Sequence, residues 1–189
     1  MNGRPERQPL ANPGALLATT HEIRGGLRVR LRLARPTDGA SVRAFLERLS
    51  PETRRRRFFA AQPTIAEPLV RHFTFFDPRE RLVVAATTPL GGSEQVVALA
   101  DLVLVATGLA ELALVVDDRF QRRGLGTLLS EAMASLAIHA HATHLKGELL
   151  SDNTPMLRLM ERLGPTVRSL EQGSATVYTR LPTDGRRAA

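Results

Sequence analysis

Cysteine and tryptophan are absent from this sequence, and tyrosine occurs only once, at Tyr178. Without cysteine the chain can form neither a disulfide nor a thiolate metal site. Aromatic residues make up only 4% of the 189 residues, so the core must be built mainly from Leu, Val and Ala. No apolar run exceeds five residues, which excludes a membrane-spanning helix. An apolar signal-peptide segment is also missing, so we expect a soluble, cytoplasmic protein.

Positive charge is what the sequence has in excess. The net charge is +7 and the isoelectric point is about 11.3, which favours anionic partners such as nucleic acids, membrane surfaces or phosphate-bearing ligands. The hydrophobic content of 43% and charged content of 24% are typical of a folded globular protein. The length suits one domain with a sizeable core.

The distribution of proline and glycine suggests the domain boundaries. Residues 1–26 contain several of both without a sustained hydrophobic period, which predicts a flexible N-terminal tail. We expect a single domain over residues 27–182 and a short C-terminal tail over residues 183–189.

Hydrophobic periodicity predicts a mixed α/β architecture. Alternation from residue 28 to 33 predicts a strand, and helical patterns follow over residues 37–49, 50–59 and 64–75. Three strands, a helix, a strand, a helix and a hairpin come next, over residues 81–88, 95–106, 109–116, 126–142, 143–150, 155–164 and 166–182. The order β-α-α-(α)-β-β-β-α-β-α-β-β predicts a mixed sheet with helices on its faces.

The stretch QRRGLG, from Gln121 to Gly126, lies between a predicted strand and a predicted helix. The first amides of a helix lack partners and carry partial positive charge, and glycines let the backbone approach a ligand closely. Arg122 and Arg123 add full charges. This pattern favours an anion-binding loop, although a tight turn with solvated arginines would have the same sequence.

Three segments together resemble the GNAT superfamily of acyl-CoA-dependent N-acyltransferases. The loop is similar to its motif Gln/Arg-x-x-Gly-x-Gly/Ala, and SDNTPMLRLMERLG resembles its second block. RLARPTDGASVRAFLERLSPETRRRRFF is similar to the first strand and helices of the bacterial protein-lysine acetyltransferase branch. The resemblance covers about residues 28–181. It implies the GNAT fold and acetyl-CoA as co-substrate.

The resemblance also implies roles for individual residues. The coenzyme A pyrophosphate would be wrapped by Gln121, Arg122, Arg123, Gly124, Leu125, Gly126 and Thr127. The pantetheine arm would pair with the backbone of Leu114, Val115 and Val116, as an added strand would. Asn153 would hydrogen-bond the same ligand; the other interpretation of Asn153 is a helix cap.

Glu111 is the candidate catalytic residue. Acyl transfer requires a neutral amine, whereas a lysine ammonium has a pKa near about 10.4, so a general base is needed. Glu111 interrupts an apolar strand and shares its face with Ala113 and Val115, and burial there would raise its pKa. In the branch resembled, a glutamate at this position is the base. The other interpretation is a solvent-facing or edge glutamate that interrupts an apolar, aggregation-prone strand.

The remaining chemistry is less complete. We expect a backbone amide near Val115 or Val116 to stabilise the oxyanion. Many family members have a tyrosine in the helix after the asparagine, but this chain has none there, and Pro165 stands where phenylalanine is common. A tyrosine acid mechanism is therefore in doubt. We interpret Tyr178 as a core or hairpin residue.

The overall hypothesis is an acetyl-CoA-dependent N-acetyltransferase that acts on a primary amine, with a protein lysine as the favoured acceptor. A small-molecule amine acetyltransferase and an acyl-CoA-binding regulatory module without turnover are the alternatives. Nucleic-acid binding through Arg54–Arg57 is disfavoured because these side chains point in different directions. No metal site is expected from His139, His141 and His144. A homodimer is a reasonable expectation.

Overall fold

The computed structural model describes residue 17, residues 19–59 and residues 64–182. Its elements follow in the order β1 (Thr20–Ile23), β2 (Leu27–Leu33), η1 (Pro36–Asp38), α2 (Gly39–Arg48), α3 (Pro51–Phe58), α4 (Glu67–Thr74), β3 (Arg81–Leu90), β4 (Ser93–Ala106), β5 (Leu109–Val116), η2 (Asp118–Phe120), α5 (Leu125–His139), β6 (His144–Leu150), α6 (Thr154–Leu163), β7 (Thr166–Glu171) and β8 (Ser174–Arg180). The predicted α/β class and mixed sheet are confirmed, and the predicted order of elements is confirmed from β2 onward.

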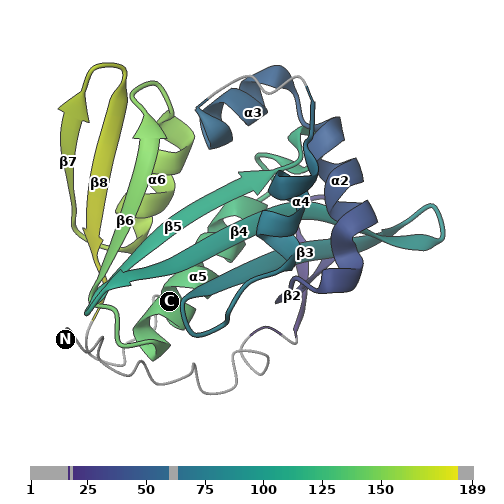
Figure 1. The fold of residues 1–189 in the computed structure, drawn as a ribbon, viewed down its shortest axis with the longest axis horizontal. Coiled ribbons are helices and arrows are strands. Elements are labelled where there is room, and N and C mark those ends of the chain that lie inside the picture. Colours follow the sequence, from purple (N-terminus) through teal and green to yellow (C-terminus); the bar gives the residue numbers. More distant parts are fainter. Residues whose placement is uncertain (1–16, 18, 60–63, 183–189) are drawn as a thin grey trace.

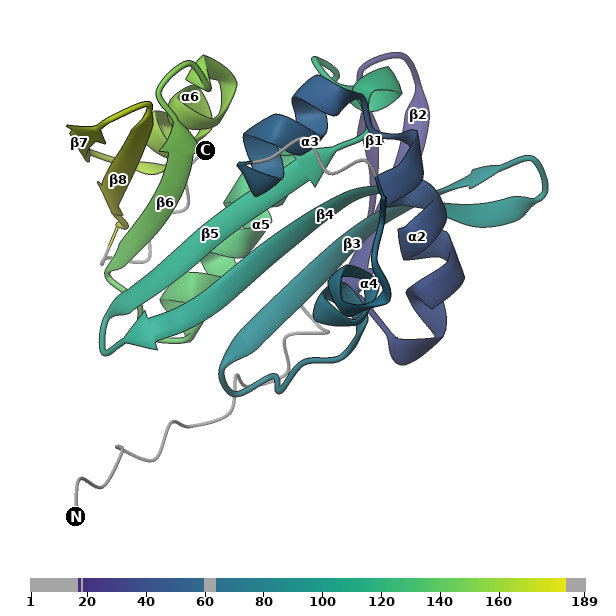
Figure 2. The ribbon, with the colours of Figure 1, turned by 45° about the horizontal axis from the view of Figure 1, so that its top comes forward.

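One sheet organises the molecule, with strand order β1-β2-β3-β4-β5-β6-β8-β7. All neighbouring strands are antiparallel except β5 and β6, which run parallel. Parallel neighbours need a crossover, and α5 supplies it. Helices α5 and α6 cover one face of the sheet, while α2, α3 and α4 lie on the other (Figure 1, Figure 2).

Each face of the sheet has its own apolar core. The larger core combines residues of β2–β6 and β8 with α5 and α6, among them Leu112, Leu129 and Met133. The smaller core packs Phe45 of α2 and Phe73 of α4 against the other face, which includes Val115. Alternate residues of β5 therefore contribute to different cores, as the side-chain period of a strand requires.

Two predicted boundaries are wrong. The flexible tail was expected to reach residue 26, but Thr20–Ile23 form strand β1, which pairs with β2 through a turn at Gly25 and Gly26. Residues 1–16 and the expected C-terminal tail at 183–189 lie outside the described residues. Helix α5 ends at His139 rather than near residue 142, because the chain turns at His141, whose φ is 61°. Both differences leave the central sheet as predicted.

The parallel pairing of β5 and β6 is short. It comprises only the partners Leu109 with His144, Ala110 with Leu145, and Glu111 with Lys146. Beyond Glu111 the two strands separate, and α3 lies above the opening (Figure 1, Figure 2). The second half of β5 is therefore paired with β4 on one side only.

Candidate active site

The opening between β5 and β6 exposes backbone groups that can pair with an extended ligand. Asp117 donates its backbone N–H to Val97 of β4, so in an alternating ladder the amide of Val115 also faces β4. By the same alternation the backbone groups of Leu114 and Val116 face the opening. The Val116 carbonyl accepts a hydrogen bond from the Gln121 amide Nε2 at 3.0 Å.

The loop between β5 and α5 has an unusual backbone. Arg122 has a φ of 59° and Gly124 a φ of 90°, so both lie in the left-handed region. This conformation costs a non-glycine residue such as Arg122 free energy and is found preferentially at functional sites. The first helical hydrogen bond of α5 runs from Leu128 to the Gly124 carbonyl, so the preceding amides point out of the helix end.

Aspartates fix this loop against α3. Asp118 accepts hydrogen bonds from the Ser50 amide and hydroxyl and from the Thr53 hydroxyl. Asp117 is only 1% exposed and accepts from the backbone and guanidinium of Arg119. These contacts hold both aspartates in the turn after β5. These hydrogen bonds fix the geometry of the loop between β5 and α5.

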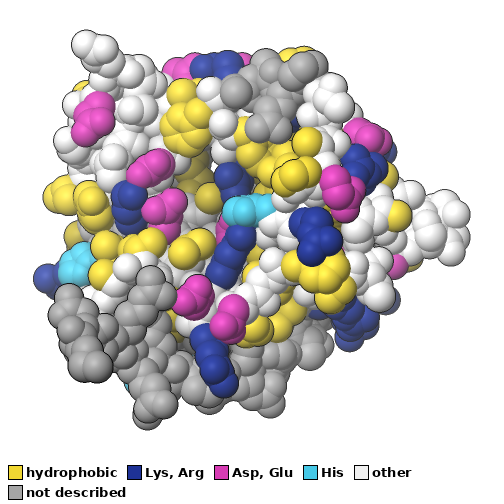
Figure 3. Space-filling view, viewed as in Figure 1, with side chains coloured by type: hydrophobic (Ala, Val, Ile, Leu, Met, Phe, Trp, Pro, Cys, Tyr) yellow, Lys and Arg dark blue, Asp and Glu magenta, His cyan; other side chains and the backbone are white. Residues whose placement is uncertain are grey.

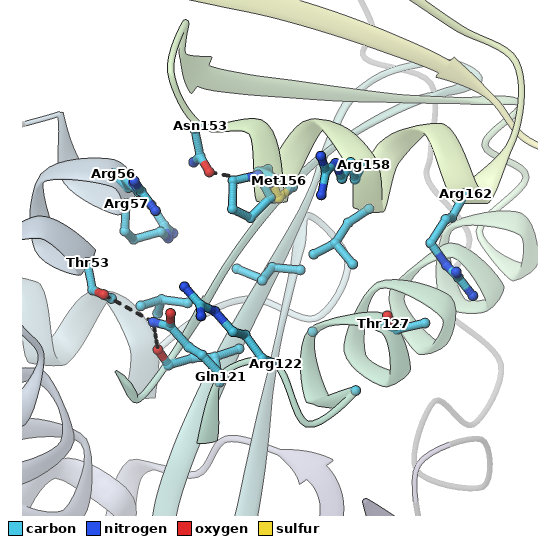
Figure 4. Close-up of a pocket in the computed structure, with 17 residues that line it drawn as sticks. Thr53, Arg56, Arg57, Gln121, Arg122, Thr127, Asn153, Met156, Arg158 and Arg162 are labelled. Atoms are coloured by element: carbon cyan, nitrogen blue, oxygen red, sulfur yellow. Dashed lines mark hydrogen bonds between the residues drawn. The ribbon is translucent and has the colours of Figure 1, made fainter. Parts of the chain in front are cut away.

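A cavity of about 680 Å³ joins the opening, the loop and α6. Five arginines line it and none of the described residues that line it is acidic. They come from three places: Arg56 and Arg57 on α3, Arg122 on the loop, and Arg158 and Arg162 on α6 (Figure 4). So much positive charge around one cavity favours a ligand with several negative charges.

Most of the residues proposed from the sequence for acetyl-CoA line this cavity. They are Leu114, Val115, Val116, Gln121, Arg122, Gly124, Gly126, Thr127 and Asn153. Two do not. The guanidinium of Arg123 lies beside the β1–β2 turn at Gly25, and the Leu125 side chain is buried in the larger core.

Asn153 is a helix cap, as one of the two interpretations from the sequence has it, and it also borders the cavity. It is the N-cap of α6, where its side-chain oxygen accepts from the Met156 amide at 3.3 Å (Figure 4). Its side chain also lines the cavity. The capping hydrogen bond occupies the side-chain oxygen of Asn153 and fixes the side chain. The amide nitrogen of Asn153 therefore has a defined orientation.

The arginines of α3 and α6 were missed by sequence reasoning. Arg54–Arg57 were considered as a disfavoured nucleic-acid site. Their different directions are confirmed: Arg55 binds Glu52 and Asp152, whereas Arg57 points toward Asp101. Arg158 and Arg162 are one helical turn apart on the polar side of α6. That spacing could have indicated a basic stripe.

Glu111 lies beside the main cavity. It lines a smaller cavity of about 80 Å³ that shares five residues with the larger one, namely Arg56, Arg57, Leu114, Asn153 and Met156. The expected apolar enclosure of Glu111 is wrong, because its side chain is 34% exposed and its carboxylate accepts a hydrogen bond from Lys146 Nζ at 3.2 Å. Its surroundings are charged, and Glu148 lines the same cavity.

A buried charge cluster on β4 lies beside Arg57, which lines both cavities. Asp101 on β4 is 6% exposed and receives hydrogen bonds from His72 Nε2 at 3.2 Å and from the Arg81 guanidinium at 2.7 Å to each carboxylate oxygen. Burial opposes ionisation, but these bonds and the charges of Arg81 and Arg57 outweigh it and hold the pKa of Asp101 below its usual range. A histidine and basic side chains are visible together on this face (Figure 3).

Arg57 connects this cluster with both cavities. Its guanidinium lies 5.2 Å from the Phe58 ring centre and 5.7 Å from that of Phe73, and reaches Asp101 only at 3.5 Å. Its Nε is buried without a hydrogen-bond partner among the described residues. Burial lowers the pKa of the Arg57 guanidinium, since one distant carboxylate does not fully replace water.

Other candidate groups lie elsewhere. Tyr178 is on β8, as expected for a hairpin residue, but it is 39% exposed and so is not in the core. Within the described ranges no group of three or more His, Cys, Asp or Glu side chains could hold a metal ion. No helix in that part of the chain is long and apolar enough to span a membrane.

Comparison with known proteins places this arrangement in a family. The Acetyltransferase (GNAT) family matches residues 43–164, and the chain belongs to this family. Its structure is similar to the GNAT domain of S. lividans PAT, with 28% identity, a TM-score of 0.77, and coverage of 86% of this chain and 96% of that one. The chain is related to the protein-lysine acetyltransferase branch, as the sequence resemblance predicted.

Two further structures extend the comparison. A cAMP-binding acyltransferase from Mycobacterium smegmatis is 26% identical with a TM-score of 0.59; the match covers 92% of this chain but only 52% of that protein. The structure of yncA, a putative acetyltransferase from Salmonella typhimurium with its cofactor acetyl-CoA, shares the fold at 14% identity and a TM-score of 0.60, with 85% and 96% coverage. The family uses acetyl-CoA.

Proposed function

We propose that the protein is an acetyl-CoA-dependent N-acetyltransferase whose acceptor is a primary amine, with a protein lysine as the favoured acceptor. The observation that carries the proposal is the arginine-lined cavity, which runs from the start of α5 to the opening between β5 and β6. A coenzyme A molecule has phosphates at one end and an extended amide-containing arm at the other. The cavity has positive charge near the start of α5, where the phosphates would lie. At the opening it has an unpaired edge of β5, where the arm would lie.

The proposed ligand geometry follows from these two ends. The pyrophosphate lies against the first amides of α5 and Arg122, and Arg158 and Arg162 on α6 supply the charges that complete its environment. The pantetheine arm extends along β5 and pairs with the backbone of Leu114 and Val116, as an added strand would. Asn153 hydrogen-bonds the arm from the opposite wall.

The proposed reaction uses Glu111 and the same strand edge. Glu111 receives a proton from the acceptor ammonium, directly or through a water molecule, and the neutral amine attacks the thioester carbonyl. The developing oxyanion accepts a hydrogen bond from a backbone amide that faces the opening. Strand alternation favours Val116 or Leu114 for this role over Val115. The coenzyme A thiolate then leaves.

The preference for a protein lysine rests on two points. The chain is related to the protein-lysine acetyltransferase branch, and its S. lividans relative covers nearly the whole domain. Glu111 and Glu148 also present two carboxylates to the smaller cavity, which suits an incoming ammonium. Amino acids and polyamines share the ammonium group, so the acceptor class requires a direct test.

Free-thiol release with lysine peptides, basic proteins and small amines tests the proposal, with calorimetry of coenzyme A in parallel. Glu111→Gln should lower turnover by about a hundredfold, as expected for loss of a general base, while coenzyme A affinity changes less than twofold. Glu131→Gln, an exposed glutamate on α5, is the matched control and should behave as the wild type.

The alternative is a regulatory module that binds acyl-CoA without turnover. The pairing of Glu111 with Lys146 favours it, because a base already engaged by a cation is less available. Saturable coenzyme A binding without thiol release from any acceptor, and without an effect of Glu111→Gln, would replace the enzymatic proposal with this one. An absence of coenzyme A binding would exclude both.

A further inference from the structure

Lysine is nearly absent from this basic protein. The sequence contains 26 lysine and arginine residues, and Lys146 is the only lysine among them. Arginine remains protonated at neutral pH and is not an acceptor for acetyl transfer under these conditions. The single side-chain amine of the chain is therefore at one defined position, and that position is beside the proposed catalytic glutamate.

The sheet fixes Lys146 at this position. Lys146 on β6 is the last residue in register with β5, and its partner there is Glu111. Immediately after this pair the strands separate into the opening that the pantetheine arm is proposed to occupy. The Lys146 side chain is 22% exposed, so it is partly covered yet reachable from solvent.

The Lys146 ammonium is paired with the two carboxylates of the smaller cavity. Its Nζ donates to Glu111 Oε2 at 3.2 Å and to Glu148 Oε1. Both carboxylates line the smaller cavity, which adjoins the larger one along shared walls. On the face seen in Figure 3, basic and acidic side chains lie together over this part of the sheet.

We propose that Lys146 is a self-acetylation site: the chain transfers an acetyl group from acetyl-CoA to its own only lysine. This inference rests on the proposed function, because it uses the same thioester and the same base. Glu111 takes a proton from the Lys146 ammonium, and the Nζ lone pair attacks the thioester carbonyl. A C–N bond forms, the C–S bond breaks, and the second Nζ proton passes to the departing thiolate. The products are Nε-acetyl-Lys146 and coenzyme A.

The local charges make this reaction slower than transfer to a weakly held amine. Hydrogen bonds to Glu148 and Glu111 raise the pKa of Lys146, although partial burial acts against them. Less neutral amine is thus present at neutral pH than for a free lysine. Acetylation removes the positive charge of Nζ, so Glu111 and Glu148 lose the cation that now pairs with both.

Mass spectrometry tests the proposal on the full chain, purified with a lysine-free tag and incubated with acetyl-CoA. We expect one acetyl group at Lys146, located by peptide mapping, with an initial rate per chain that does not depend on protein concentration. Trypsin gives a second readout, since it cleaves after unmodified Lys146 but not after the acetylated residue. Lys146→Arg should remove the modification.

Chemical acetylation by the free thioester must be separated from the proposed reaction. Glu111→Gln should slow the modification of Lys146 by about a hundredfold, with Glu131→Gln as the matched control. Excess desulfo-coenzyme A distinguishes enzymatic from chemical acetylation in the wild-type protein, without a substitution. It should block transfer from the bound thioester and leave chemical acetylation unchanged.

The outcomes distinguish this inference from the proposed function. An unmodified Lys146 in a preparation that acetylates a lysine peptide would overturn self-acetylation alone. Modification that proceeds equally in Glu111→Gln, or in the presence of desulfo-coenzyme A, would overturn it too, since the reaction would then be chemical. A chain that does not bind acetyl-CoA would overturn both.

Discussion

Replacing Asp101 by alanine should destabilise the protein strongly, because this carboxylate balances buried positive charge. Its side chain is 8% exposed, and the side chains of Arg57 and Arg81 beside it are 16% and 15% exposed. Arg81 binds both carboxylate oxygens at 2.7 Å. The Asp101→Ala variant would leave two guanidinium groups with little access to water and without a carboxylate partner.

The cost of removing one partner from a buried ion pair is about 3–5 kcal/mol. In a domain of this size each kcal/mol lowers the melting temperature by about 2–4 °C, so a decrease of about 6–20 °C is expected. Urea unfolding followed by circular dichroism measures the free energy of unfolding directly. Glu47→Ala, at an exposed site on α2, is the control and should change it by less than about 0.5 kcal/mol.

The same carboxylate predicts a pH dependence with a definite sign. The folded state holds the pKa of Asp101 below its usual range, so the stabilisation is present above the unfolded pKa of about 3.9. It is lost as the pH falls through the lower folded value. The difference in unfolding free energy between wild type and Asp101→Asn should therefore be constant near neutral pH and shrink below about pH 4.

Two results would refute this reasoning. The first is an Asp101→Ala variant as stable as Glu47→Ala, which would mean that water or rearrangement compensates the arginines. The second is a wild-type advantage over Asp101→Asn that persists at low pH, which would show that charge is not its source.

Two further predictions concern the cavity and the fold. Changing Arg158 and Arg162 together to Ala should weaken coenzyme A binding by about a hundredfold or more and reduce its salt dependence in calorimetry, because each charge-assisted contact contributes about 1.5–3 kcal/mol. Arg168→Ala, on exposed β7, should bind normally; equal loss in both variants would contradict a role for the α6 pair. Gly164→Ala should destabilise the protein by more than about 1 kcal/mol, because its Cβ would lie 2.1 Å from a β8 carbonyl oxygen. Gly39→Ala, in helix α2, should be neutral or stabilising in a thermal unfolding assay, because its Cβ would make only an ordinary contact of 3.9 Å with Val70. Similar losses at both positions would contradict the steric argument.

Much of the local structure could be predicted from short stretches of sequence. The strand ending at Val116, the helix that starts at Leu125 and the glycine between them are specified by apolar alternation, helical period and the need for a left-handed residue at Gly124. The helix predicted from residue 50 is α3, and Ser50 caps it with its hydroxyl accepting from the Thr53 amide. These features depend on neighbours within a few residues, so one sequence suffices.

Strand β1 and the end of α5 were harder to predict because their signals are weak. Thr20–Ile23 has only four residues and lies in a region rich in proline and glycine, and it becomes a strand because β2 offers it a partner. His141 ends the α5 region by adopting a positive φ without a glycine to mark the position. Strand pairing and tertiary packing therefore determined both the formation of β1 and the end of α5.

The sequence by itself determined the order of elements from β2 onward, the glycine- and arginine-containing loop before α5 and the position of a glutamate in an apolar strand, since each is a local pattern. The tertiary structure alone decided that Arg57 and Arg158 line one cavity and that Glu111 meets Lys146. Those residues are distant in the chain, and their meeting depends on which strands pair, in which register, and where β5 and β6 separate. Register is a property of the assembled sheet, so no single segment encodes it.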